Sequence, residues 1–89
     1  MNWRKRCAEF DETVLFLEGP ELDAAIVGLA SRCGQPPMLV YSTRAIVEIL
    51  RRRDGMTLEE ATEFFDFNIG GAWLGPSTPA YLDDTSTFY

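Results

Sequence analysis

The 89-residue chain carries 14 acidic and eight basic residues and no histidine, which gives it a net charge of -6 at neutral pH. A chain of this length forms one domain with a modest core. Without histidine there is no Ser-His or Cys-His catalytic pair and no imidazole metal ligand, so we expect a non-enzymatic single domain over residues 1–89 with no cofactor, no metal and no catalytic residue.

The hydropathy pattern does not indicate a membrane or secreted protein. No apolar run approaches the roughly 20 residues that span a bilayer, and the basic start of the chain turns acidic where a signal peptide needs its apolar stretch. We therefore expect a cytoplasmic location. Cys7 and Cys33 lie in no CxxC or Cys/His spacing. Reduced, partly buried thiols are favoured, with a single disulfide or a reactive cysteine as the alternatives.

The first third of the chain has weak structural signals. Residues 1–12 are expected to be a flexible end. Residues 13–18 are β-branched and apolar and precede a Gly-Pro pair, which is typical of a strand or an extended arm. Residues 20–33 have a helical stripe, although Gly28 in mid-helix would cost about 1 kcal/mol relative to alanine. A buried strand through residues 25–29 is the alternative, and the local pattern slightly favours the helix.

A strand and a helix are predicted for the middle of the chain. Residues 38–41 have the composition of a strand. Ser42 or Thr43 can cap a helix over residues 43–53, and Gly55 can take the left-handed position that ends it. The three arginines in the last turn complement the helix dipole and are expected to pair with the neighbouring acidic helix.

A second helix is predicted over residues 57–69. Thr57 and Glu60 have the spacing of a capping box at its start. The helix carries a wide apolar face that is expected to include Phe67. Gly70-Gly71 should end or kink it, because glycine weakens a helix interior.

The charge is divided into three blocks. Residues 1–23 carry three basic and six acidic residues, residues 24–53 carry five arginines and one glutamate, and residues 54–89 carry seven carboxylates and no basic residue. The net charges of these blocks are -3, +4 and -7. Such an acidic C-terminal block is poorly suited to a phosphate backbone and better suited to a basic protein surface.

The acidic helix carries most of the candidate binding residues. Glu59, Glu63 and Asp66 are separated by four and three residues, so their carboxylates lie on one face of the helix. One interpretation is a solvated surface that complements the helix dipole, and the other is a row of carboxylates that faces a partner. No spacing of these carboxylates resembles a calcium-binding loop. Trp73 is either a core residue or an interface anchor. The predicted partner-binding residues are Glu59, Glu60, Glu63, Asp66, Trp73, Asp83 and Asp84.

Residues 23–82 resemble a family of small, mostly uncharacterised proteins of phages and prophages. The resemblance is carried by AIVG at residues 25–28, LVY at residues 39–41 and the pattern DGMTxEEAxxxFxFNxxGAxxGxxTP over residues 54–79. It implies an antiparallel hairpin over residues 24–42, because similar sequences join these two segments by a very short link. This chain has the longer SRCGQPP connection, which is also compatible with a helix end.

The sequence therefore predicts an α+β fold. A small antiparallel β-sheet packs against two consecutive helices at about 43–53 and 57–69, with an edge strand near residues 78–82 and a flexible end at residues 83–89. The alternative is a mostly helical domain in which residues 20–33 form a helix.

The function predicted from charge and resemblance is that of an acidic protein–protein interaction module. We expect a phage-encoded inhibitor of a bacterial nucleic-acid-binding defence complex, similar to anti-CRISPR or anti-restriction proteins, whose carboxylates take the place of phosphates. The partner would be a basic protein surface, with no direct contact to nucleic acid or membrane, and a homodimer is compatible with this interpretation. One alternative is a nucleic-acid-binding regulator that uses Arg51 to Arg53 and Arg4-Lys5-Arg6. Another is a virion or assembly adaptor.

Overall fold

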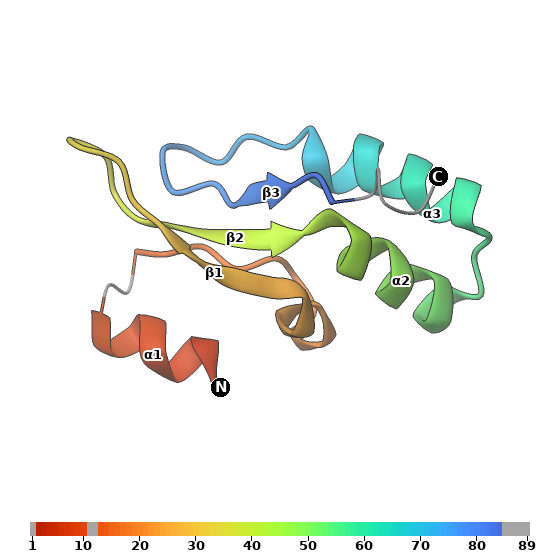
Figure 1. Cartoon of the computed structure of the whole chain (residues 1–89), viewed down its shortest axis with the longest axis horizontal. Coiled ribbons are helices and arrows are strands. Elements are labelled where there is room, and N and C mark those ends of the chain that lie inside the picture. The colour runs from red at the N-terminus through yellow and green to blue at the C-terminus, as the bar shows by residue number, and fades with distance from the viewer. Residues whose placement is uncertain (1, 11–12, 85–89) are drawn as a thin grey trace.

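The computed structural model describes residues 2–10 and 13–84 and has an α+β fold, which confirms the predicted fold class. A three-stranded sheet occupies one half of the molecule and two consecutive helices the other (Figure 1). The elements in chain order are α1 (Trp3–Phe10), the 3-10 helix η1 (Pro20–Ala25), β1 (Ile26–Ala30), β2 (Met38–Ser42), α2 (Thr43–Asp54), α3 (Leu58–Phe65), the π-helical turn η2 (Asp66–Gly70) and β3 (Ala80–Leu82).

The sheet is mixed and has the order β1-β2-β3. β1 and β2 form the predicted antiparallel hairpin, with Leu29 opposite Leu39. β3 pairs parallel with β2, with Ala80 opposite Val40. This pair corrects the expectation of a wholly antiparallel sheet. Strands β2 and β3 are joined through both helices, and such a long crossover is the connection that parallel neighbours require.

The core lies on one face of the sheet. Leu39 and Tyr41 of β2 are fully buried there, at 0% exposure. Ile46 and Leu50 of α2 and Ala61 of α3 are buried to the same extent and belong to the same cluster. Because side chains alternate along a strand, the other residues of β2 lie on the opposite face.

The segment between Gly19 and β1 does not form the α-helix that the spacing of its apolar residues favours. Residues 20–25 form a 3-10 helix that begins at Pro20, and the chain then turns extended at Ile26 to enter β1. Residues 13–18 belong to no strand and run along the sheet as an arm. Residues 26–30 form a strand because they pair with β2. The hydrogen bonds of this pairing outweigh the weak local preference of residues 20–33 for a helix.

The beginning of the chain was expected to be flexible, but the structure has a helix there. Within residues 1–12, α1 buries Cys7 to 2% exposure. The Arg4 guanidinium pairs with Asp23 at 2.7 Å and lies 4.5 Å from the ring centre of Phe16. These contacts attach α1 to the arm and to η1, and sequence spacing gives no signal for either.

The turn between α2 and α3 is formed as predicted. The Ser42 side chain caps α2 by accepting from the N–H of Ala45, and Gly55 ends the helix with φ 66° and ψ 28°. Thr57 and Glu60 form the capping box, in which Thr57 accepts from the Glu60 N–H at 3.1 Å and Glu60 accepts from the Thr57 N–H at 2.9 Å.

The second predicted helix, residues 57–69, changes its geometry near the middle. α3 ends at Phe65 and continues as the π-helical turn η2. Phe65 is buried, whereas Phe67 is 85% exposed, so the expectation that Phe67 joins the apolar face is wrong. Two residues that are two positions apart point to opposite sides of a helix, and only one of them can face the core. Gly70 closes η2, where a Cβ would lie 3.0 Å from the Phe65 ring.

Candidate protein-binding face

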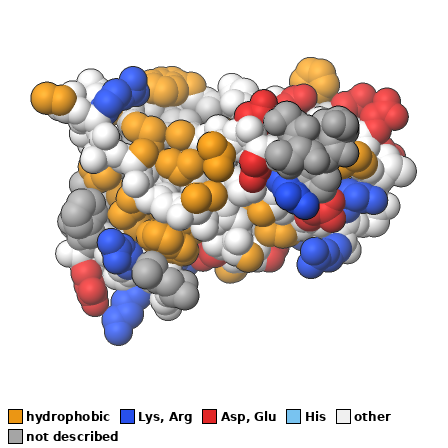
Figure 2. All heavy atoms as spheres, viewed as in Figure 1, with side chains coloured by type: hydrophobic (Ala, Val, Ile, Leu, Met, Phe, Trp, Pro, Cys, Tyr) orange, Lys and Arg blue, Asp and Glu red, His pale blue; other side chains and the backbone are white. Residues whose placement is uncertain are grey.

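Three carboxylates form an acidic face on α3 and η2. Glu59, Glu63 and Asp66 are exposed, and their spacing places them on one side of the helix. None of them makes an ion pair with any residue in the described part of the chain. Acidic side chains gather along the edge of the molecule formed by α3 (Figure 2). We call Glu59, Glu63 and Asp66 the acidic face.

Glu60 was predicted to belong to this set, but the structure gives it another role. Its Oε1 atom accepts the backbone N–H of Thr57 at 2.9 Å and so completes the capping box. Its carboxylate adds negative charge near the helix start, where it also complements the helix dipole. Glu60 therefore orients α3, and a change there would disturb the fold as well as the charge.

Two of the three arginines in the last turn of α2, Arg51 and Arg53, pair with residues outside the acidic face. Arg53 contacts Glu21 at 2.6 Å and Asp54 at 2.9 Å, and Arg51 contacts Glu48 at 3.1 Å. The hydrogen bond from Arg53 lowers the pKa of the Glu21 carboxyl below its ordinary value. The expectation that these arginines pair with the acidic helix is therefore wrong. Arg51 and Arg53 are engaged elsewhere, and Arg52 makes no ion pair with a described residue, so the carboxylates of the acidic face are not neutralised by α2.

Large apolar side chains are exposed in η2 and in the segment that follows it. Phe67, Trp73 and Leu74 are 85%, 75% and 67% exposed. Trp73 is therefore not a core residue, and the other prediction, an interface anchor, fits its position. Exposed aromatic side chains of this kind are enriched in protein interfaces.

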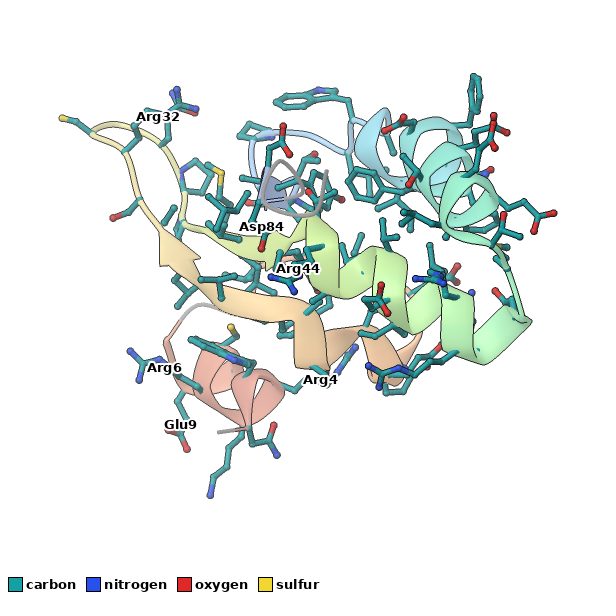
Figure 3. All side chains as sticks on the ribbon, turned by 45° about the vertical axis from the view of Figure 1, so that its right-hand side comes forward. Arg4, Arg6, Glu9, Arg32, Arg44 and Asp84 are labelled. Carbon is teal, nitrogen blue, oxygen red and sulfur yellow. The ribbon has the colours of Figure 1, made fainter. Side chains whose placement is uncertain are left out.

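Asp83 and Asp84 take different roles although they are adjacent. Asp83 is exposed and lines a shallow hollow together with Asp66, so the structure brings this residue to the acidic face. Asp84 instead accepts the Ser42 hydroxyl at 2.6 Å and the backbone N–H of Arg44 at 2.9 Å. Figure 3 shows Asp84 beside Arg44 at the start of α2.

The contacts of Asp84 change its titration. Desolvation raises the pKa of this carboxyl, but the hydrogen bonds from Ser42 and from backbone N–H groups outweigh it, and the pKa is lowered overall. Asp84 therefore holds the start of α2 to the end of β3, although it was predicted to bind a partner.

An apolar groove of about 370 Å³ lies between α2, η2 and the segments on either side of them. Its lining comes from several separate parts of the chain, so no sequence spacing indicates it. The apolar residues that line it include Leu22, Leu50, Phe64, Ile69, Leu74 and Tyr81.

Among residues 2–10 and 13–84, no three Cys, Asp or Glu side chains come together in an arrangement that would hold a metal ion. Within the same residues, no helix is both long enough and apolar enough to cross a membrane.

Comparison with known proteins gives no family for the chain. No protein-family model matches it, and no curated protein and no solved structure is significantly similar to it.

Proposed function

We propose that this chain is a non-enzymatic binding protein that docks its acidic face on a basic protein surface. The observation that carries the proposal is that Glu59, Glu63 and Asp66 are exposed and make no ion pair with any described residue. Carboxylates left unpaired on one side of a molecule attract a basic surface over long range and accelerate association. Phe67, 85% exposed beside them, would supply apolar contact at close range.

We propose further that the partner is a bacterial complex that binds nucleic acid as part of host defence. In the nucleic-acid-binding groove of that complex, the acidic face would occupy the place of the phosphates of the nucleic acid. The resemblance of residues 23–82 to phage and prophage proteins supports this choice, since such an inhibitor benefits a phage. The net charge of -6 also suits competition with nucleic acid for a basic groove.

Direct binding of nucleic acid is less well supported by the contacts. Arg51 and Arg53 form ion pairs with neighbouring carboxylates, and Arg4 pairs with Asp23. A phosphate would have to displace these partners. Arg4, Arg51 and Arg53 therefore stabilise the fold through ion pairs within the chain.

The experiment is displacement of a fluorescent DNA or RNA from purified bacterial defence complexes, followed by fluorescence anisotropy. The wild-type chain should displace the nucleic acid from at least one complex. The double variant Glu59→Lys/Glu63→Lys should lose this activity by a factor of ten or more, which corresponds to about 1.4 kcal/mol. Circular dichroism should show an unchanged fold, because both side chains are exposed.

A charge-matched control separates position from net charge. Glu9 and Glu18 are exposed and lie outside the acidic face, so Glu9→Lys/Glu18→Lys makes the same change in net charge at another place. This control should still displace the nucleic acid. Equal loss in both double variants would mean that total charge, and not the acidic face, decides binding.

A further inference from the structure

The sheet has a second face that is apolar. Leu39 and Tyr41 point into the core, so Met38 and Val40 point the other way. The register between strands adds neighbours on the same side, and a bulge places both Val27 and Gly28 opposite Val40. Hydrophobic side chains gather over the three strands (Figure 2). We call this surface the open face; it consists of Val27, Gly28, Ala30, Met38, Val40, Ser42, Ala80 and Leu82.

The open face is accessible at its edges and has no charged residue of its own. Val27 and Leu82, on the two edge strands, are 54% and 48% exposed. The positions between them are glycine, alanine, valine and methionine, with Ser42 at one end, where its hydroxyl donates to Asp84. An apolar surface of this kind suits contact with an aromatic or aliphatic side chain of a partner.

Arginines lie around the open face. Arg32 is exposed in the connection between β1 and β2, at one end of the strands, where Figure 3 labels it. At the other end, Arg44, Glu48 and Arg52 of α2 line a shallow hollow together with Ser42, the last residue of β2. Glu48 pairs with Arg51, and Asp84 accepts from the backbone N–H of Arg44, so Arg52 is the cation of this hollow that has no ion pair with a described residue. The partner that fits this surface is therefore apolar at its centre and acidic around it.

The acidic face of the same chain has this chemistry. Glu59, Glu63 and Asp66 make no ion pair with a described residue, and Phe67 beside them is 85% exposed. We infer that the acidic face and Phe67 of one copy dock on the open face of a second copy, head to tail. Carboxylates would then meet Arg32 and Arg52, and the phenyl ring would contact the apolar strands.

The two surfaces are different, so this contact is heterologous. In such a contact each dimer still presents one unused acidic face and one unused open face, and further copies can add. The average mass should therefore rise gradually with concentration and fall with added salt. The contact shares the acidic face with the proposed function but needs no host protein, so each can fail without the other.

The test is a complementation experiment by sedimentation velocity. One variant, Glu59→Gln/Glu63→Gln/Asp66→Asn, removes the acidic charge. The other, Val27→Glu/Leu82→Glu, places carboxylates on the open face at positions that are already half exposed. Each variant alone should remain monomeric. An equimolar mixture should form 1:1 dimers and nothing larger, because only one intact surface of each kind remains.

Three results would overturn the inference. The first is a wild-type chain that stays monomeric up to roughly 1 mM, in which case the open face serves a foreign partner or none. The second is association that persists in either variant alone, which would indicate another interface. The third is a mixture that fails to dimerise while both variants show the wild-type circular dichroism spectrum.

Discussion

The backbone N–H of Leu17 donates a hydrogen bond to the hydroxyl of Tyr41 at 3.0 Å. This bond joins the arm of residues 13–18 to the central strand. Tyr41 is fully buried, and burial raises the pKa of its hydroxyl. The arm makes no ladder with the sheet, so this side-chain contact and the apolar packing of Phe16 and Leu17 hold it in place.

Removing the Tyr41 hydroxyl should destabilise the domain measurably. Tyr41→Phe keeps the ring but leaves the Leu17 N–H without its acceptor, which costs about 1–3 kcal/mol. The free energy of unfolding from urea titration measures the loss. Tyr81→Phe is the matched control, because the Tyr81 hydroxyl makes no hydrogen bond with a described residue. Equal losses in both variants would show that the bond to Leu17 contributes nothing.

Gly55 fixes the turn between α2 and α3 through its backbone conformation. Its φ of 66° is left-handed, and nothing lies within 4 Å of where a Cβ would be. Gly55→Val should therefore cost about 1–2 kcal/mol through strain alone, which lowers the melting temperature by about 4–8 °C per kcal/mol in a domain of this size. Gly55→Asn should lose much less, because asparagine tolerates this conformation. Thermal melting that does not distinguish the two variants would contradict this account of the turn.

Asp84 should make part of the stability dependent on pH. Its pKa is lowered in the folded state, so its stabilising contribution is present above the ordinary pKa of aspartate and is lost as the pH falls through the folded value. Asp84→Ala should therefore lower the melting temperature near neutral pH, and the loss should become smaller as the pH falls below the ordinary pKa of aspartate, about 3.9. Asp66→Ala, at an exposed position, serves as the control. A difference between Asp84→Ala and wild type that is constant over this range would exclude the ionised carboxylate as the cause.

The parts of the fold that follow from short segments could be predicted from the sequence. Ser42, Gly55 and the Thr57–Glu60 capping box lie within a few residues of the helix ends that they set, and all of them act as predicted. The hairpin over residues 24–42 followed from the resemblance, and the structure has it.

The parts that depend on distant contacts could not be predicted. The parallel pairing of β3 with β2 and the position of Asp84 at the start of α2 join residues about 40 positions apart. The residues that line the apolar groove also come from parts of the chain that are distant in sequence. The acidic face was predictable from its spacing alone, but its lack of ion pairs was not, because the partners of Arg51 and Arg53 were known only once the fold was known.

The most direct test of the proposed function is the salt dependence of binding to a purified defence complex that the chain inhibits. Isothermal titration calorimetry gives Kd over a range of NaCl concentrations. For the wild type and for Glu9→Lys/Glu18→Lys, affinity should fall steeply as salt rises, because the acidic face meets a basic surface. For Glu59→Lys/Glu63→Lys, binding should be weak at every salt concentration. If this variant binds with the affinity and salt dependence of the wild type, the acidic face is not the binding surface.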